Sequence, residues 1–400
     1  LVIQKYGGAT LATPEKLKEV ARKIKEDAKK YRLIVVVSAM GGTTNELIEL
    51  AHQVSAHPQK REMDMLLSVG ERISMSLMSM ALYDLNVPAI SLTGSQAGIF
   101  TNETHNNAYI FDIKAFRIEE ALQSGKVVIL AGFQGVSPVT KEITTLGRGG
   151  SDITAVAVAA AFSANRCEIL KDVSAVFTAD PRLVPTARSI PQLTYDEMFD
   201  MCFWGAKVLQ FRSAEIALMN QINLYIGPSD PAHGSGTLIS AESKEAKMKL
   251  EGFRVISINS HERVLILEHR GLISKTYKEI LSSFDKNQIP YGQVLHWEYN
   301  SQNDVGRVYL TGPNEVLAAI QQAIENQILP GLSLDKQEWC AVGVTCQGAH
   351  HPESLDFCLE NLSRTGLTPR QILFTQSGLG FLVEKNLRVK AIESLHQLIR

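Results

Sequence analysis

The chain has 400 residues, of which 45% are apolar and 20% are charged, and its formal net charge is -2. This is the composition of a soluble globular protein that is long enough for two or three domains. The charge balance gives no reason to expect nucleic acid or a membrane surface as a partner. The longest apolar runs, such as residues 33–37 and 127–131, have the length of strands and fall well short of the roughly 20 residues of a membrane span.

The cysteines and the N-terminus both bear on where the protein works. Five cysteines without a C-x-x-C pair argue against a disulfide framework or a zinc site and favour reduced thiols in the cytoplasm. No signal-peptide pattern precedes the first predicted strand. Because Leu1 is not a start residue, we expect a Met or a short leader to be missing in front of it.

The first 226 residues alternate short β-branched runs with helical stretches. Strands are expected at residues 2–3, 33–37 and 127–131, with helices that begin at about Pro14, Thr43 and Ser151. Thr13 is the expected N-cap of the first helix, because Pro14 suits the first helical turn. The alternation predicts an α/β domain with a mainly parallel sheet sandwiched by helices.

A cluster of Gly, Pro and Ser at residues 227–237 is the expected domain boundary. Beyond it two similar rounds follow, with strands expected at 254–258, 263–267, 293–298, 306–310, 339–345, 371–375 and 380–383, and helices at 272–284, at 314–327, from about 352 and at the C-terminus. The two rounds predict paired ferredoxin-like α+β modules of roughly 70 residues. The expected domains are residues 1–237, 238–335 and 336–400.

Three glycine-rich turns follow predicted strands and are candidates for binding phosphate: residues 7–8, 41–42 and 147–151. Neither G-x-x-x-x-G-K-[ST] nor G-x-G-x-x-G occurs in the chain, but the N–H groups and the dipole at any helix N-terminus attract anions. Each turn taken alone is more often explained by the steric freedom of glycine. Lys5 precedes the first turn, at the strand end where open α/β sheets bind ligands. A solvated lysine is the alternative there.

The run from Thr144 to Asp152, T-T-L-G-R-G-G-S-D, carries the strongest signal in the chain. It combines a backbone nest for anions, an arginine that can grip a carboxylate by two bonds, and an aspartate on the first helical turn. The alternative is a helix that is merely capped by Ser151 or Asp152. That alternative leaves three glycines and an arginine unexplained, so the run predicts the centre of an active site.

These motifs together resemble those of the aspartate kinases, which belong to the amino-acid-kinase superfamily. The similarity covers, in order, residues 5–8 (K-Y-G-G), 36–44 (V-V-S-A-M-G-G-T-T), 62–71 (E-M-D-M-L-L-S-V-G-E), 92–99, 131–135, 144–152, 177–182 (F-T-A-D-P-R) and 205–209 (G-A-K-V-L). It extends over the first 240 residues. The resemblance implies an amino-acid-kinase fold followed by two ACT regulatory modules.

The resemblance also implies the reaction, in which ATP with Mg²⁺ phosphorylates the β-carboxylate of L-aspartate to give 4-phospho-L-aspartate. This is the entry step to lysine, methionine and threonine synthesis. The catalytic residues it implies are Lys5, Asp152 and Lys207, with Asp152 orienting the lysines and no metal held by the protein itself.

Binding residues follow from the same resemblance. The implied ATP site consists of Lys5, Tyr6, Gly7, Gly8, Asp172, Phe177, Arg182 and Lys207. Lys5 and the N–H groups of the two glycines would contact the β- and γ-phosphates. The implied aspartate site consists of Thr44, Glu71, Arg148 and Ser151. Arg148 would clamp the α-carboxylate of the substrate, and Glu71 would receive its ammonium.

This chemistry needs no general base, because the attacking carboxylate is already ionised at pH 7. The difficulty is to bring an anion to a polyanion, which lysines, backbone N–H groups and Mg²⁺ relieve. His105 is therefore interpreted as a substrate-loop or structural residue rather than a base. Residues 63–80, rich in Met, are expected to form a mainly buried helix. Glu71 on that helix needs a partner, and Arg72 competes with a substrate ammonium for that place.

The chain departs from the family pattern in three places. Residues 171–177 read K-D-V-S-A-V-F instead of T-D-V-D-G-V-Y, so Lys171 stands where the family has a small hydroxyl residue beside the nucleotide. Gln210 and Phe211 replace a frequent His-Pro pair. Residues 267–272 lack the Asp and Pro of the turn that commonly holds a lysine or threonine effector in ACT domains.

The resemblance bears on regulation and assembly too. In this family the strand after the linker joins the second ACT module, so residues 253–259 are expected to pair with residues 339–345. A homodimer or larger assembly is expected, with an amino-acid effector at the ACT interface. Two alternatives stay open at this point: a non-catalytic amino-acid-sensing protein, suggested by the altered residues 171–175, and a related kinase with glutamate or a carbamate as acceptor.

Overall fold

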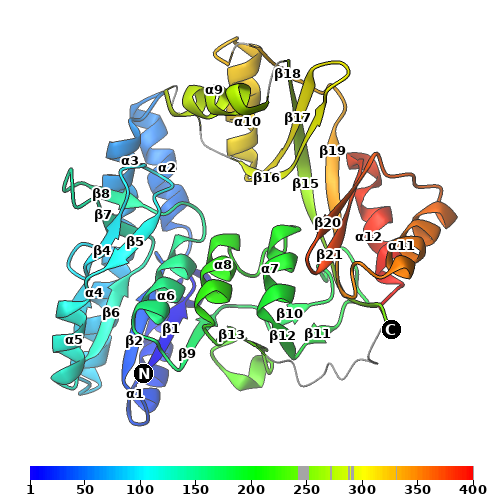
Figure 1. The fold of residues 1–400 in the computed structure, drawn as a ribbon. Coiled ribbons are helices and arrows are strands. Elements are labelled where there is room, and N and C mark those ends of the chain that lie inside the picture. Colours follow the sequence, from blue (N-terminus) through cyan, green and yellow to red (C-terminus); the bar gives the residue numbers. More distant parts are fainter. Residues whose placement is uncertain (242–251, 271–272, 287–288, 290–291, 330, 400) are drawn as a thin grey trace. The chain divides into compact units, whose positions relative to one another are not determined.

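The computed structural model describes residues 1–241, 252–270, 273–286, 289, 292–329 and 331–399. The chain divides into two compact units. The first unit comprises Leu1–Val176, Ser189–Phe199 and Lys207–Ala246, and the second comprises Phe177–Arg188, Asp200–Ala206 and Lys247–Arg400. Figure 1 labels most of the helices and strands of both.

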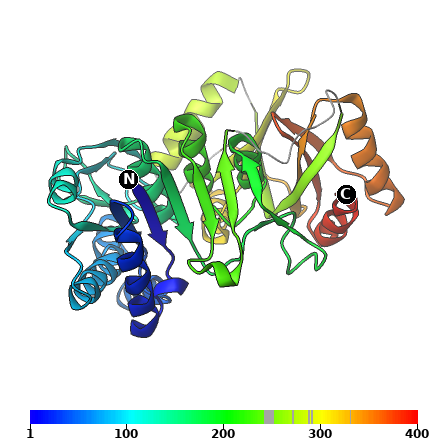
Figure 2. The same cartoon turned by 90° about the horizontal axis from the view of Figure 1, so that it is seen from below.

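The first unit is built on an eight-stranded sheet with β1 (Val2–Tyr6) near its middle. The order across the sheet is β12 (Gln192–Thr194), β14 (Thr237–Ser240), β13 (Leu224–Gly227), β9 (Arg166–Leu170), β1, β2 (Leu33–Val37), β6 (Val127–Ala131) and β3 (Ala89–Leu92). Only the β13–β14 pair is antiparallel among the pairings in the described part of this sheet. The predicted mainly parallel sheet is confirmed. In Figure 2 the blue strand β1 lies beside the green strands of the same sheet.

Helices cover both faces of this sheet, which is why its central strands are apolar throughout. α1 (Pro14–Ala28) and α4 (Val69–Asp84) pack on one face, where Val20 and Met78 share a buried core with Tyr6. α6 (Gly150–Ala161) packs against β1 and β9 on the opposite face, with α8 (Phe211–Asn220) beside it (Figure 1). Because side chains alternate along β1, Tyr6 points to the α1 core and Lys5 to α6.

Shorter elements complete the first unit. A four-stranded sheet has the order β5 (Ile110–Ile113), β4 (Ile99–Thr101), β7 (Gln134–Val136) and β8 (Ile143–Thr145). The other elements of this part of the chain are η1 (Ala9–Leu11), α2 (Thr43–Val54), α3 (Lys60–Leu67), α5 (Phe116–Gln123), β10 (Val176–Phe177), β11 (Ser189–Ile190), α7 (Tyr195–Phe203) and η2 (Pro231–His233). Thr13 caps α1 as predicted, because its side chain accepts a hydrogen bond from the N–H of Lys16.

The single buried helix expected at residues 63–80 is wrong. The chain forms two helices there, α3 and α4, which meet at Ser68. Met78 is fully buried, but Met80 is 61% exposed, so only one side of α4 faces the core. The stretch Lys60–Asp84 is long and apolar enough to cross a membrane by length and composition. The break at Ser68 and the buried carboxylates of Asp64 and Glu71 mark it instead as part of a folded core.

A seven-stranded antiparallel sheet forms the second unit. Its order is β16 (Gln293–Asn300), β17 (Val305–Thr311), β15 (Arg254–Arg270), β19 (Trp339–Gln347), β21 (Gly378–Glu384) and β20 (Gln371–Thr375), and β18 (Leu332–Leu334) pairs with β15. The helices of this unit are α9 (Ile273–Lys286), α10 (Asn314–Glu325), α11 (Pro352–Arg364), the short η3 (Lys385–Leu387) and α12 (Arg388–His396). Three apolar clusters lie in its described residues, one around Leu317, one around Phe381 and one around Trp204.

β15 is one strand where the sequence led us to expect two. Its first half, from Arg254 to Val264, pairs with β19, and its second half, from Leu265 to Arg270, pairs with β17. Shifts of register after Val255 and after His261 allow the strand to bend while it stays paired. The strand after the linker thus joins the sheet of the C-terminal half, which is the pairing that the family resemblance implied.

Candidate active site

Two neighbouring parallel strands, β1 and β9, end side by side. Tyr6 stands opposite Leu170, and the N–H of Gly7 donates to the carbonyl of Leu170 at 3.1 Å. The glycine pair that follows β1 therefore lies next to Lys171, which follows β9. This is the carboxyl edge of the sheet, where open α/β sheets bind ligands.

Asp152 forms an ion pair with each of its two carboxylate oxygens. Lys5 Nζ lies 2.7 Å from Oδ1, and Lys171 Nζ lies 2.8 Å from Oδ2. Lys171 Nζ also donates to the carbonyl of Val208 at 2.7 Å. The side chains of Lys5 and Asp152 are buried, whereas that of Lys171 is 20% exposed. One carboxylate thus orients two lysines at the sheet edge.

Burial and the ion pairs shift the pKa values of Asp152 and Lys5 in opposite directions. Burial raises the pKa of Asp152, but the charges of Lys5 and Lys171 outweigh it and hold that pKa below its usual value. Burial also lowers the pKa of Lys5, which Asp152 partly offsets. Asp152 is therefore ionised at neutral pH, as a carboxylate that positions cations has to be.

The turn after β1 lies close to these lysines. A Cβ atom on Gly8 would lie 2.7 Å from the carbonyl oxygen of Ala39, so only glycine fits there. A Cβ atom on Gly7 would lie 3.7 Å from Lys5 Nζ and 3.9 Å from Lys171 Cγ. Backbone N–H groups next to two ammonium groups are a combination that suits a polyphosphate.

Glu71 lies in the first turn of α4 and is 4% exposed. Its Oε1 accepts a hydrogen bond from the N–H of Ala39 at 3.0 Å. Its Oε2 is buried and has no hydrogen-bond partner among the described residues, and no ion pair joins it to Arg72 there. Burial raises the pKa of Glu71 to about 7. A buried carboxylate oxygen without a partner is a ready acceptor for a ligand ammonium.

The glycine-rich run before α6 has a different cap from the one considered in the sequence. Gly149 is the N-cap and takes a left-handed conformation, with φ 73°. Ser151 and Asp152 therefore lie inside the first turn, so the interpretation of either one as the cap is wrong. A Cβ atom on Gly149 would lie 2.7 Å from the side chain of Gln210. Gln210, one of the departures from the family pattern, thus packs on this run and also caps α8.

The other predicted substrate residues surround the same edge of the sheet. Ser151 is buried against the backbone of Gly132, which follows β6: a Cβ atom on that glycine would lie 2.8 Å from Ser151 Cβ. Thr44 is half-buried in the first turn of α2, and Arg148 is exposed in the turn before α6. Thr44 thus stands in the first turn of a helix that follows β2, and Ser151 in the first turn of α6, which follows β8 of the four-stranded sheet.

Not every predicted nucleotide residue lies in the first unit. Asp172 and Lys207 do, and both are exposed. Phe177 and Arg182 belong to the second unit, where the guanidinium of Arg182 forms two hydrogen bonds with Asp180. The structure brings together Lys5, Gly7, Gly8, Glu71 and Asp152 as one electrostatic group.

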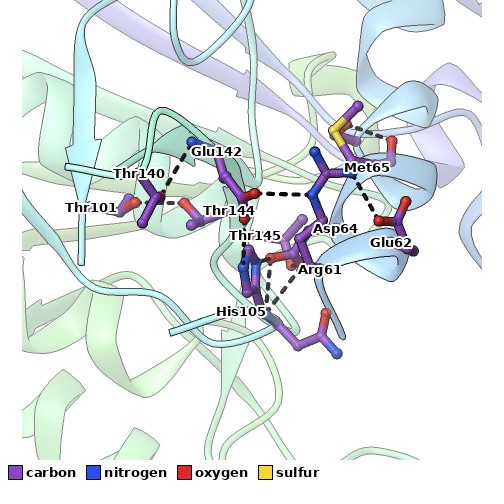
Figure 3. A network of polar contacts seen from close by, with 12 residues as sticks. Arg61, Glu62, Asp64, Met65, Thr101, His105, Thr140, Glu142, Thr144 and Thr145 are labelled. Carbon is purple, nitrogen blue, oxygen red and sulfur yellow. Dashed lines mark hydrogen bonds and ion pairs between the residues drawn. The ribbon is translucent and has the colours of Figure 1, made fainter. Parts of the chain in front are cut away.

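His105 is held in a network of carboxylates (Figure 3). Its Nδ1 lies 2.6 Å from Asp64 Oδ2, and its Nε2 lies 3.4 Å from Glu142 Oε2. The fully buried Asp64 also accepts hydrogen bonds from the Thr145 hydroxyl at 2.5 Å and from the N–H of Asn106 at 3.1 Å. This network ties α3 to β8, the strand that leads into the glycine-rich run, so His105 has structural contacts.

Sequence reasoning missed Lys171 as a member of the site. It noted this lysine only as a departure from the family pattern. The signal was present, because Lys171 directly follows the buried strand β9, next to β1, and Lys5 is the penultimate residue of β1. Only the pairing of β1 with β9 shows that the two lysines meet.

Comparison with known proteins places the chain in a family. Residues 1–228 match the model of the amino acid kinase family. The aspartokinase of Mycolicibacterium smegmatis is 38% identical over 99% of this chain and 95% of its own length. The chain belongs to the amino acid kinase family, among the aspartokinases. The aspartokinase of Geobacillus stearothermophilus is 37% identical over 99% of this chain and 96% of its own length.

Solved structures of aspartokinases are similar in fold to this chain. E. coli aspartokinase III, in complex with aspartate and ADP, aligns over 100% of this chain and 99% of its own with a TM-score of 0.81 and 22% identity. The aspartate kinase of Synechocystis aligns over 99% of this chain and 69% of its own with a TM-score of 0.55 and 32% identity. The predicted α/β fold with α+β C-terminal modules is confirmed.

Proposed function

We propose that this chain is an aspartate kinase that transfers the γ-phosphate of ATP to the β-carboxylate of L-aspartate, giving ADP and 4-phospho-L-aspartate. Its membership of the aspartokinases supports this function. The observation that carries it in the structure is the pair of ion pairs that Asp152 makes with Lys5 and Lys171, beside the turn of Gly7 and Gly8. A cationic group beside a glycine turn suits a transferring phosphoryl group.

In the proposed nucleotide site Lys5 and the N–H of Gly8 hold the β- and γ-phosphates. Asp152 keeps Lys5 in place for this task. The N–H of Gly7, which the family resemblance also implied, donates to the carbonyl of Leu170 instead. Lys207 contacts phosphate, and Asp172, Phe177 and Arg182 are the other proposed nucleotide residues. Tyr6 is not among them, because its side chain is fully buried in the core with α1.

The proposed aspartate site uses the unpartnered oxygen of Glu71. Glu71 Oε2 receives the substrate ammonium, which supplies the partner that this buried atom lacks among the described residues. Arg148 clamps the α-carboxylate, since guanidinium groups bind carboxylates by two parallel bonds. Thr44 and Ser151 line the same pocket. These contacts leave the β-carboxylate of the substrate directed toward the lysines.

The chemical step then needs no proton transfer. An oxygen of the substrate β-carboxylate forms a bond to the γ-phosphorus while the bond from the γ-phosphorus to the bridging oxygen of ADP breaks. The negative charge of the attacking carboxylate ends on ADP. Lys5 offsets the charge that gathers between the two anions, which would otherwise repel each other.

Mg²⁺ is proposed to enter as the complex with ATP rather than as a resident metal. The described residues contain no group of three or more His, Cys, Asp or Glu that could hold a metal ion. Both oxygens of Asp152 are occupied by lysines. The described part of the chain therefore offers no complete cage, which is usual for a magnesium ion that arrives with phosphates.

We propose further that the C-terminal part regulates the kinase, with ACT modules at residues 238–335 and 336–400 after a catalytic domain at 1–237. E. coli aspartokinase III has been solved in complex with lysine and aspartate. By analogy an amino acid such as lysine or threonine is the proposed effector. A homodimer or larger assembly, a cytoplasmic location and a place in lysine, methionine and threonine synthesis complete the proposal.

One assay tests the function. Purified protein is incubated with ATP, Mg²⁺ and L-aspartate in the presence of hydroxylamine, which traps an acyl phosphate as the hydroxamate. We expect aspartyl hydroxamate to form with L-aspartate. We expect no hydroxamate when glutamate or a carbamate replaces aspartate as the acceptor. If the protein bound ATP but formed no hydroxamate with any acceptor, the alternative of an amino-acid-sensing protein that activates a partner kinase would replace the proposal. Lys171, which suggested that alternative, is built into the site instead.

A further inference from the structure

Lys171 stands where the aspartate kinases have a small hydroxyl residue, and its side chain reaches into the proposed nucleotide site. Its Nζ lies 2.8 Å from Asp152 Oδ2 and 2.7 Å from the carbonyl oxygen of Val208. Its Cγ would lie 3.9 Å from a Cβ atom on Gly7, in the turn that is proposed to hold phosphate. A surface lysine at a strand end would have neither a buried carboxylate partner nor this neighbour.

The charges around Asp152 do not balance. When Lys5 and Lys171 are both protonated, one carboxylate faces two ammonium groups, so one positive charge is in excess. A buried excess charge is costly unless an anion neutralises it. Glu71 does not remove this excess in the working complex, because its free oxygen is proposed to receive the substrate ammonium. The excess is therefore available to an anion that enters beside Gly7.

The geometry of the Lys171 ammonium also leaves a donor for that anion. An ammonium group has three N–H donors. Two of them are directed to Asp152 and to Val208. The side chain of Lys171 is 20% exposed, compared with 6% for that of Lys5. Lys171 is therefore the more accessible of the two lysines, and its third donor can reach an incoming anion. The two hydrogen bonds hold the group in place before the ligand arrives.

We propose that Lys171 is a phosphate-binding lysine of the nucleotide site, which works beside Lys5 and is an addition of this chain to the family pattern. The inference rests on the proposed function insofar as the phosphates are those of ATP. Lys171 shares Asp152 with Lys5, so nucleotide binding neutralises the excess positive charge of this group. Its bond to Val208 also links the phosphate site to the residue that follows Lys207.

Binding measurements on the full-length protein test this inference without requiring turnover. We would compare the affinities for ADP and for adenosine in the wild type and in Lys171→Met. This substitution keeps an unbranched side chain of similar length but removes its charge. The expected result is an about 10- to 100-fold rise in the dissociation constant for ADP, which is the size of one hydrogen bond to a charged group. The affinity for adenosine, which has no phosphate, should be unchanged.

The matched control is Lys23→Met. Lys23 also forms a 2.9 Å ion pair with an aspartate, Asp27, but on α1 and away from the turn of Gly7. This variant should bind ADP as the wild type does. Lys171→Arg, which retains a positive charge, should recover part of the lost ADP affinity, and Lys171→Thr, which restores the family's small hydroxyl residue, should lose as much as Lys171→Met. These two variants also serve if Lys171→Met folds poorly.

Two results would overturn the inference: wild-type ADP affinity in Lys171→Met and Lys171→Thr, or an equal loss of affinity for ADP and adenosine, which indicates a role in folding alone. The hydroxamate assay of the wild type separates this test from the proposed function. A wild type that forms no hydroxamate but whose ADP affinity depends on Lys171 refutes the proposed function and leaves the inference in place.

Discussion

Glu71 accepts a hydrogen bond from the N–H of Ala39 with one oxygen, while its other oxygen is buried without a partner in the described part of the chain. The hydrogen bond fixes the carboxylate at the end of β2, and the other oxygen is an unused acceptor for the proposed substrate ammonium. Two predictions depend on this arrangement, one on substrate binding and one on stability.

Glu71→Gln should raise the KM for aspartate by about 100-fold, the size of a buried hydrogen bond to a charged group, and should leave the KM for ATP nearly unchanged. Gln keeps the acceptor for Ala39 but loses the charge that attracts the ammonium. Because the pKa of Glu71 is raised to about 7, kcat/KM for aspartate in the wild type should fall as the pH drops below 7. Steady-state kinetics between pH 5.5 and 8.5 measure both effects. A wild-type pH profile in Glu71→Gln would contradict this role.

The same residue should make the ligand-free protein less stable as the pH rises. The folded pKa of Glu71 lies above its unfolded value of 4.5, so the stability gained from its protonated form is complete below 4.5 and is lost as the pH rises to about 7. Glu71→Gln has no charge to bury, and so should be more stable than the wild type at pH 8 by about 1–3 kcal/mol. Urea unfolding at pH 5 and pH 8 tests this. Aspartate should narrow the difference, because its ammonium neutralises Glu71.

Asp152→Ala should abolish turnover and also destabilise the fold. Removal of this carboxylate leaves Lys5 and Lys171 next to each other without a counter-charge. Breaking a buried ion pair in this way costs about 3–5 kcal/mol. Chemical denaturation monitored by circular dichroism measures the loss, with Glu360→Ala, which removes an exposed pair with Arg364, as the control. Unchanged stability would show that the two lysines do not depend on Asp152.

His105→Gln should keep the turnover rate within about 10-fold of the wild type, since loss of a general base costs about 100- to 10,000-fold. The reacting carboxylate carries no proton for His105 to remove, and the imidazole is bonded to Asp64 instead (Figure 3). The variant should instead lose thermal stability, because Asp64 is fully buried and loses one of its partners. The contrary result is a turnover rate about 100- to 10,000-fold lower with unchanged thermal stability. It would show that His105 takes part in catalysis.

Gly343→Ala should disrupt the second unit. Trp204 is fully buried, and a Cβ atom on Gly343 would lie 2.0 Å from its Cγ. Overpacking of this kind costs about 1–3 kcal/mol or more. All three tryptophans of the chain, Trp204, Trp297 and Trp339, belong to the second unit, so tryptophan fluorescence reports its unfolding directly. The same variant tests whether this unit influences nucleotide affinity, because Lys207 follows Trp204 by only three residues.

The elements of this protein were largely predictable from local patterns. The apolar runs at residues 33–37 and 127–131 are strands, α1 begins at Pro14 with Thr13 as its cap, and β20 has the predicted bounds. These features depend on side chains close together in the sequence: an alternation of strands and helices, a hydroxyl before a proline, a run that is buried on both faces. Family motifs such as residues 144–152 likewise indicated where the active site lies.

Longer-range features were not predictable in this way. Residues 254–270 form one continuous strand rather than two. Its first half pairs with β19 and its second half with β17, so the whole stretch stays paired. No local sequence pattern specifies which strand a segment pairs with. Ser151 and Asp152 are not the N-cap of α6. Gly149 occupies that position, in a left-handed conformation that glycine adopts readily. The break at Ser68 between α3 and α4 is similarly hidden in a continuous apolar run.

The sequence by itself determined that this chain is an aspartokinase-like α/β protein, and it predicted the candidate active site at the residues after β1 and before α6. Only the tertiary structure decided which cations meet there. Lys5 and Lys171 are 166 positions apart in the chain, and each alone is an ordinary lysine at a strand end. The pairing of β1 with β9 and the packing of α6 across them bring both ammonium groups to one carboxylate. Electrostatic interactions depend on distance in space, and folding alone sets that distance.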